Sequence, residues 1–88
     1  MNFIKKSNRI YSVNEEGKIV AEIDFEKKFG LDNTYVIFRT FVDKSLQGQG
    51  IAGLLVEEAI REIQGRGANF EAKCSFAKEY LEKKKNRQ

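Results

Sequence analysis

The sequence predicts an α+β domain in which a mostly antiparallel sheet packs against two main helices. Three patterns along the 88 residues support this fold class. Apolar and polar side chains alternate over residues 18–25, as in a strand with one buried face. Apolar side chains recur at helical spacing over residues 51–64. Between these segments, a run rich in β-branched and aromatic residues ends in glycines, which predicts a strand followed by a loop.

The first half of the chain is predicted to form three antiparallel strands. Residues 10–13 form a short strand, and the turn-forming residues 14–17 join it as a hairpin to the strand over residues 18–25. A second turn covers residues 29–33, and residues 34–42 form a central strand.

The second half is predicted to form a helix, a short strand and another helix. Residues 51–64 carry a broad apolar stripe, and Gly65 and Gly67 end this helix. Residues 69–73 form a short strand. Residues 75–84 place four side chains at helical spacing, namely Phe76, Ala77, Tyr80 and Leu81. The connection through the first helix is long enough for a parallel crossover, so we expect both helices on one face of the sheet.

Composition indicates one small globular domain. The apolar fraction is 41% and the charged fraction 33%, both ordinary for a soluble domain. We expect the domain to span residues 1–82, with a frayed basic tail over residues 83–88 that holds much of the net charge of +3. Nucleic-acid binding is disfavoured because this charge is not spread over the folded body. No apolar run is long enough to span a membrane, so no membrane association is expected.

Cysteine and histidine counts exclude several kinds of chemistry. The single Cys74 cannot form an internal disulfide, which indicates a reducing compartment such as the cytoplasm. Histidine is absent, which excludes a histidine general base, a Cys–His nucleophile pair and a histidine metal site. One cysteine cannot build a zinc cage, so we expect no metal centre.

The segment from Gly48 to Gly53 is the strongest functional signal in the sequence. A predicted strand, a loop with Gly48 and Gly50 and a predicted helix follow one another directly. Glycine allows a close backbone approach to a ligand, and the first turn of a helix presents free N–H groups and partial positive charge. Together these features favour a phosphate or pyrophosphate site. The alternative is a turn that only joins a strand to a helix.

The loop also carries a family resemblance. The string Gln47-x-x-Gly50-x-Ala52 resembles the Gln/Arg-x-x-Gly-x-Gly/Ala signature of the GNAT superfamily of N-acetyltransferases. Five segments are similar to the short YjdJ-type branch and its plant relatives, over residues 17–25, 34–37, 40–43, 47–52 and 73–77. The resemblance covers residues 10–82 and implies a minimal GNAT-like fold. It further implies an acetyl-CoA-dependent N-acetyltransferase acting on a small-molecule or peptide amine.

The resemblance also implies a set of site residues. The coenzyme contacts would come from the strand end, the loop and the start of the last helix: Phe41, Val42, Gln47, Gly48, Gln49, Gly50, Ile51, Ala52, Gly53 and Ser75. Cys74 would lie near the acetyl group, as an acyl acceptor or as a proton donor to the departing coenzyme. A predicted helix N-terminus, with Lys73 and Lys78 nearby, would lower the thiol pKa. The alternative for Cys74 is a small buried apolar side chain.

Other candidate residues have ordinary structural alternatives. Glu22 and Asp24 are candidate bases on one strand face, which could equally be a solvated face. Tyr80 could donate a proton to the leaving thiolate, or it could pack in the core. Arg39 stands where the family usually has histidine. A non-catalytic module that binds acetyl-CoA or CoA, and an adaptor acting through the basic tail, therefore stay open as alternatives.

Overall fold

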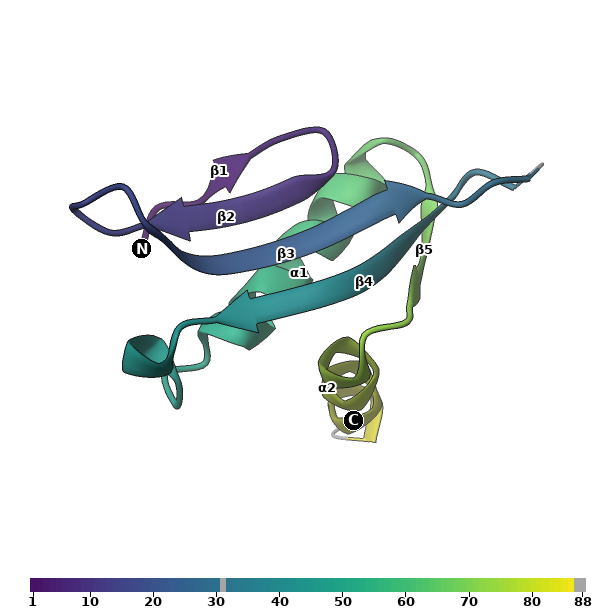
Figure 1. Cartoon of the computed structure of the whole chain (residues 1–88). Helices are drawn as coiled ribbons and strands as arrows, with labels where there is room; N and C mark the ends of the chain where they lie inside the picture. Colours follow the sequence, from purple (N-terminus) through teal and green to yellow (C-terminus); the bar gives the residue numbers. More distant parts are fainter. Residues whose placement is uncertain (31, 87–88) are drawn as a thin grey trace.

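The chain forms a five-stranded sheet with helices on one side. The structure is a computed structural model and describes residues 1–30 and 32–86. The strands are β1 (Ile4–Lys5), β2 (Arg9–Val13), β3 (Ile19–Lys27), β4 (Thr34–Val42) and β5 (Asn69–Ala72). The helices are α1 (Ile51–Gly65) and α2 (Ser75–Asn86), with a short 3₁₀ helix at Lys44–Leu46. The strand order is β1-β2-β3-β4-β5 (Figure 1).

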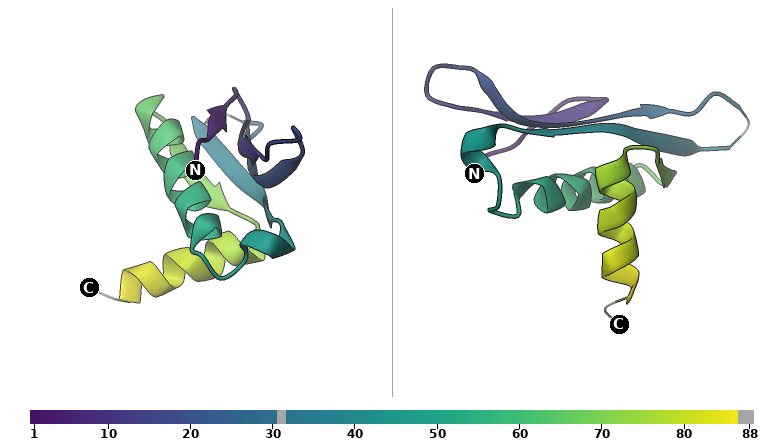
Figure 2. Two further views of the ribbon diagram at one scale, coloured as in Figure 1. Left: turned by 90° about the vertical axis from the view of Figure 1, so that its left-hand side faces the viewer. Right: turned by 60° about the horizontal axis from the view of Figure 1, so that its bottom comes forward.

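Pairing within the sheet confirms the predicted α+β class. β1 to β4 are antiparallel neighbours, and β5 pairs in parallel with β4 through the α1 crossover. Alternation along β3 turns Ala21, Ile23 and Phe25 toward the helices, and none of the three has exposed surface. Leu55 and Ala59 of α1 meet this face and are likewise fully buried. The main core therefore lies between α1 and the sheet, with both helices on the same side (Figure 2).

The pairing of β4 with β5 is short, and this break positions the site. Only residues 34–37 of β4 pair with β5, ending at Ile37 and Ala72. The register with β3 passes from Phe25 opposite Ile37 to Asp24 opposite Arg39, so Phe38 is an extra residue in β4. Such a bulge bends a strand and increases its twist. Beyond it, β4 diverges from β5 and leaves one edge open (Figure 1).

Three local features differ from the sequence prediction. β1 was not predicted, because its two residues give no periodic pattern. α2 reaches Asn86, so Lys83 to Lys85 form its last turn rather than a frayed tail. Three cationic side chains at a helix C-terminus interact favourably with the helix dipole, which accounts for this extension. Leu31, in the predicted turn 29–33, and Arg87 and Gln88, in the predicted tail, lie outside the described residues.

Candidate functional site

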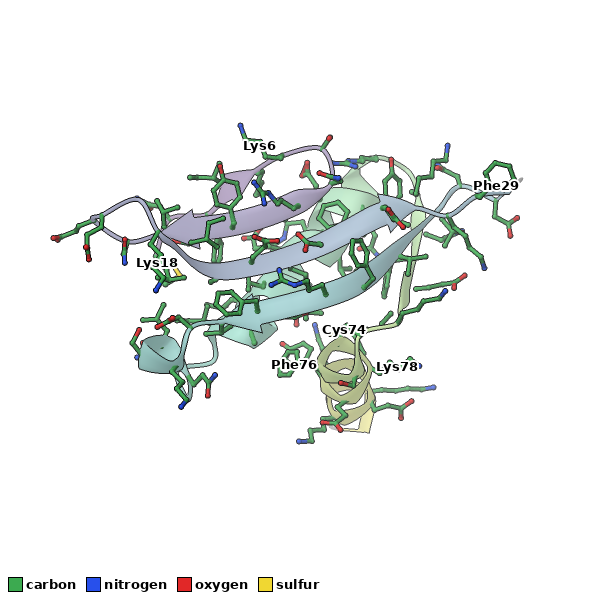
Figure 3. All side chains as sticks on the ribbon, in the orientation of Figure 1. Lys6, Lys18, Phe29, Cys74, Phe76 and Lys78 are labelled. Atoms are coloured by element: carbon green, nitrogen blue, oxygen red, sulfur yellow. The ribbon has the colours of Figure 1, made fainter. Side chains whose placement is uncertain are left out.

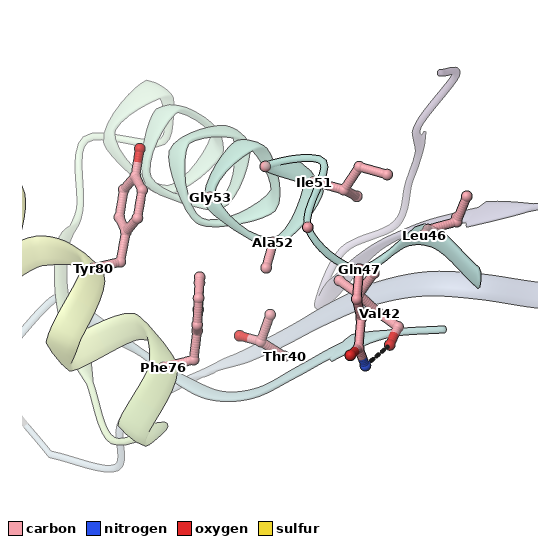
Figure 4. A pocket seen from close by; sticks show the side chains of 11 residues that line it. Thr40, Val42, Leu46, Gln47, Ile51, Ala52, Gly53, Phe76 and Tyr80 are labelled. Atoms are coloured by element: carbon pink, nitrogen blue, oxygen red, sulfur yellow. Dashed lines mark hydrogen bonds between the residues drawn. The ribbon is translucent and has the colours of Figure 1, made fainter. Parts of the chain in front are cut away.

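A pocket of about 600 Å³ lies where the open edge of β4, the glycine loop and both helices meet (Figure 4). Its floor is the C-terminal half of β4, and the N-terminus of α1 and one face of α2 form its walls. The residues that line it are Thr40, Val42, Leu46, Gln47, Gly48, Gly50, Ile51, Ala52, Gly53, Phe76 and Tyr80. A pocket of this size accommodates a small molecule or the arm of a larger cofactor.

The loop leading into α1 depends on two glycines. Gly48 has a φ of 84° and Gly50, the N-cap of α1, has a φ of 77°. L-residues with side chains rarely adopt this left-handed conformation, so glycine is required at both positions. Gln47 steadies the loop because its Nε2 donates a hydrogen bond to the Val42 carbonyl at 3.2 Å (Figure 4).

The N-terminus of α1 is arranged to receive an anion. The Gly50 carbonyl accepts the first hydrogen bond of α1, from the Leu54 N–H at 3.2 Å. The N–H groups of residues 51–53 therefore have no partner within the helix. Gly50 provides no side-chain cap, and the first turn of α1, all of it described, contains no acidic side chain. The helix dipole adds partial positive charge at this point.

The open edge of β4 offers backbone groups to the pocket. The Asp43 N–H donates to the Val20 carbonyl at 2.8 Å, which fixes the edge that faces β3. Because successive residues of a strand turn their polar groups to opposite edges, those of Thr40 and Val42 face the open side. The Phe41 backbone faces β3 instead. An extended ligand could therefore pair with Thr40 and Val42.

Cys74 lies at the far end of this edge, immediately before α2. Its Sγ donates a hydrogen bond to Thr40 Oγ1 at 3.4 Å, and its backbone N–H donates to the Ile37 carbonyl at 3.3 Å. Burial raises the pKa of the Cys74 thiol, but hydrogen bonds to Thr40 and to the Ala77 and Phe76 backbone outweigh it and lower the pKa overall. The amides at the N-terminus of α2 therefore lower the thiol pKa, as the sequence predicted. Lys73 and Lys78 were expected to help, and they are not among the causes of the shift.

A comparison with protein families decides the classification. The family model of the GCN5-related N-acetyl-transferases matches residues 10–88. The chain belongs to this family. None of the curated proteins compared with the chain matches it.

Solved structures support the same fold. A GCN5-like protein from Staphylococcus aureus is 29% identical, with a TM-score of 0.73 over 97% of this chain and 81% of that one. A GNAT-family protein from Desulfovibrio desulfuricans is 14% identical, with a TM-score of 0.65 over 73% of this chain. The Escherichia coli N-acetyltransferase YhbS, solved with CoA, is 19% identical, with a TM-score of 0.58 over 68% of this chain. This chain spans 41% and 35% of the last two proteins.

Most of the predicted coenzyme contacts line the pocket. Seven do so: Val42, Gln47, Gly48, Gly50, Ile51, Ala52 and Gly53. Gln49 is exposed on the loop, Ser75 is exposed at the start of α2, and the Phe41 ring lies under the Arg39 guanidinium on the other face of the sheet. Four lining residues were not predicted from the sequence, namely Thr40, Leu46, Phe76 and Tyr80. The helical spacing of Phe76 and Tyr80 predicted one apolar face of α2, but that face was assigned to the core and not to a pocket.

Tyr80 joins the two helices. Its hydroxyl donates to Glu57 Oε2 at 2.8 Å, and Lys84 Nζ donates to the same oxygen at 2.6 Å. A Cβ atom on Gly53 would lie 2.7 Å from the Tyr80 ring, so Gly53 lets α2 approach α1. The Tyr80 and Phe76 rings stack at 6.1 Å between centroids and form one wall of the pocket (Figure 4). Tyr80 therefore shapes the pocket, and its hydroxyl is engaged by α1.

Glu22, Asp24 and Arg39 lie on the opposite face of the sheet from the main core. Glu22 is only 7% exposed, so this part of the strand is not a solvated face. Its carboxylate accepts hydrogen bonds from Arg39 at 3.0 Å and from Arg9 at 3.4 Å. Burial raises the Glu22 pKa most, and the neighbouring Asp24 raises it further, against the opposing charges of the two arginines.

None of the described helices is long and apolar enough to cross a membrane. Within residues 1–30 and 32–86, no group of three or more His, Cys, Asp or Glu side chains is placed to hold a metal ion.

Proposed function

We propose that this protein is an acetyl-CoA-dependent N-acetyltransferase that acts on a small-molecule or peptide amine. The observation that carries the proposal is the continuous pocket from the free amides of α1, along the open edge of β4, to Thr40 and its Cys74 partner. Membership of the GCN5-related family supports this reading of the pocket. The five segments that resemble the short YjdJ-type branch support assignment to that branch.

Acetyl-CoA would occupy the pocket segment by segment. The pyrophosphate would meet the first-turn amides of α1 and the loop at Gly48 and Gly50. The pantetheine arm is extended and carries amides, so it would pair with the backbone of Val42 and Thr40 like an added strand. The Phe76 and Tyr80 rings would cover its apolar side.

The acetyl end would then lie near Thr40 and Cys74. In the reaction, the amine nitrogen bonds to the acetyl carbon, the carbon–sulfur bond breaks, and coenzyme A leaves as a thiolate that takes up a proton. Cys74 would donate that proton, or would accept the acetyl group itself and pass it on to the amine. The Thr40 hydroxyl can accept a hydrogen bond from the Cys74 thiol and can donate one to its thiolate, so the two side chains can stay hydrogen-bonded in either protonation state.

A non-catalytic acetyl-CoA-binding module is the second candidate function. Arg39 favours it, because this residue stands where the family usually has histidine and its guanidinium is held by Glu22 and Asp24. A cysteine that forms no disulfide suits a reducing compartment. For either candidate function we therefore propose a cytoplasmic location.

Two measurements in sequence separate the candidates. Isothermal titration with acetyl-CoA tests the pocket, and thiol release over a panel of amines tests transfer. Binding together with amine-dependent release supports the enzyme, and binding without release supports the module. Absence of binding contradicts both.

A further inference from the structure

One carboxylate of α1 binds two donors from successive turns of α2. Glu57 Oε2 accepts a hydrogen bond from the Tyr80 hydroxyl at 2.8 Å and another from Lys84 Nζ at 2.6 Å. Residues four apart lie on the same face of a helix, so both donors come from the face of α2 that is turned to α1. Two attachments on successive turns fix the rotation of α2 about its own axis as well as its distance from α1.

The Tyr80 ring is held by two positions of α1 that lie one turn apart. A Cβ atom on Gly53 would lie 2.7 Å from Tyr80 Cε1 and 3.3 Å from its Cζ, so the ring packs directly on the α1 backbone. The hydroxyl of the same ring reaches Glu57, four residues further along α1. The ring is therefore held both at its edge and at its hydroxyl.

Phe76 extends this fixation into the pocket. It precedes Tyr80 by one turn of α2, and the two rings stack with an interplanar angle of 23° and centroids 6.1 Å apart. Figure 3 shows Phe76 and Lys78 on opposite sides of α2, with Phe76 on the side of the glycine loop. In the close view, Phe76 lies between Tyr80 and Thr40 (Figure 4). Both rings line the pocket and Glu57 does not, so Glu57 stands behind an aromatic wall.

This position gives the Glu57 carboxylate more weight than an ordinary surface ion pair has. The Lys84 side chain is 56% exposed, and ion pairs with so much exposure contribute little to stability. A wall that is already ordered, however, spares a ligand the entropy cost of ordering it. The apparent affinity of a pocket is reduced by the fraction of molecules in which its walls are not in place.

We propose that Glu57 is a positioning residue for the coenzyme and that it acts through Tyr80, by holding the Phe76–Tyr80 wall where the pantetheine arm binds. This inference rests on the acetyl-CoA site proposed above. Without the bond from Tyr80 to Glu57, the open edge of β4 and the amides of α1 would still be present. The wall would then be in place in fewer molecules, and acetyl-CoA would bind more weakly.

A double-mutant cycle measured by calorimetric titration of acetyl-CoA tests the route through Tyr80. Glu57→Ala and Tyr80→Phe should each weaken binding about fivefold, as expected for one lost hydrogen bond. The double variant should be no weaker than either single variant, because all three lack the same bond. Glu62→Ala, at a glutamate that pairs with Arg66 within α1, and Tyr11→Phe, in β2, are the matched controls and should bind like the wild type. Additive losses in the double variant, or wild-type affinity in Glu57→Ala, would overturn the inference.

A structural readout separates positioning from a loss of stability. The contact of the Tyr80 ring with Gly53 should give a nuclear Overhauser effect between the ring protons and the Gly53 α protons, and this signal should weaken in Glu57→Ala. Urea unfolding establishes that each variant is folded under the conditions of the titration. Weaker binding with an unchanged signal would mean that Glu57 does not act through the wall. If the wild type binds acetyl-CoA and Glu57→Ala binds it equally well, only this inference fails. If the wild type does not bind acetyl-CoA, the proposed function fails, and this inference fails with it.

Discussion

At the residue scale, the proposed chemistry depends on the hydrogen-bonded pair Cys74 and Thr40. Hydrogen bonds from Thr40 and from the α2 amides outweigh burial and lower the pKa of the Cys74 thiol. The thiolate is therefore populated at a lower pH than in an ordinary cysteine. Acetyl transfer that depends on this thiol should consequently follow its titration.

Thr40→Val should raise the pKa of Cys74, because it removes a hydroxyl that stabilises the thiolate and conserves the shape of the side chain. Alkylation by iodoacetamide at pH 7 should then slow several-fold, and bound acetyl-CoA should protect the wild-type thiol. Thr34→Val, at the start of the same strand, is the matched control and should leave the rate unchanged. A wild-type rate no faster than that of a model peptide would mean that Cys74 is only a packing residue.

Cys74→Ala tests the role of the thiol more directly. Because the pocket does not include the Cys74 side chain among its lining, acetyl-CoA affinity should change little, whereas acetyl transfer should fall. Calorimetry and thiol release on the same preparation measure the two quantities. Unchanged transfer with unchanged binding would remove Cys74 from the reaction.

Single residues also show what the sequence could not reveal. Cys74 and Thr40 are 34 residues apart, and no local pattern predicts their hydrogen bond. Phe41 was expected to contact the coenzyme, but the pairing with Glu22 turns its backbone toward β3. The bulge at Phe38 shifts the alternation by one residue, and this shift is hidden in the sequence because apolar side chains occupy both faces of β4.

At the scale of elements, α2 is held against α1 by Glu57. Lys84 lowers the Glu57 pKa most, and Tyr80 lowers it further, against the effect of burial. A carboxyl whose pKa is lower in the folded state stabilises the fold above its unfolded pKa, and loses this effect as pH falls through its folded pKa.

Glu57→Gln should therefore destabilise the protein at pH 7, by about 1 kcal/mol for a half-exposed pair. The difference from wild type should shrink as pH falls below the ordinary glutamate value of 4.5, because the wild-type carboxylate then becomes protonated. Urea unfolding at several pH values measures this difference in the free energy of unfolding, with Glu62→Gln as the control within α1. A difference independent of pH would exclude the ion pair as its source.

Gly53→Ala should destabilise the protein although alanine is the better helix former by about 1 kcal/mol. Its Cβ would lie 2.7 Å from the Tyr80 ring and displace α2, which costs about 1–3 kcal/mol for an overpacked contact. Gly65→Ala, with open space around its Cβ, should be neutral or stabilising. If thermal unfolding shows both variants to be equally stable, the close contact between α1 and α2 is wrong.

The main elements could be predicted because their periodicities are strong. β4 matches its predicted bounds, and α1 differs from its prediction by one residue. The missed β1 contains two residues, and the extension of α2 depends on charge at its end rather than on apolar spacing. The pocket wall formed by Phe76 and Tyr80 was assigned to the core because spacing alone does not distinguish a core face from a pocket face.

At the scale of the whole molecule, the break between β4 and β5 positions the proposed site. It opens an edge of β4 to the pocket on the helix side. The proposed chemistry is assigned to the side chains and amides around this break.

The most direct test of this account is calorimetric titration of acetyl-CoA into the wild type, Gly50→Asp and Gly17→Asp. Both variants add the same charge at a left-handed glycine, with φ values of 77° and 83°, but only Gly50 lines the pocket. Wild type and Gly17→Asp should bind alike, and a hundredfold excess over Kd should stabilise each by about 2.7 kcal/mol. Gly50→Asp should bind at least about tenfold more weakly, because its carboxylate meets the pyrophosphate. No binding to the wild type at millimolar acetyl-CoA, or equal binding by all three proteins, would contradict the account.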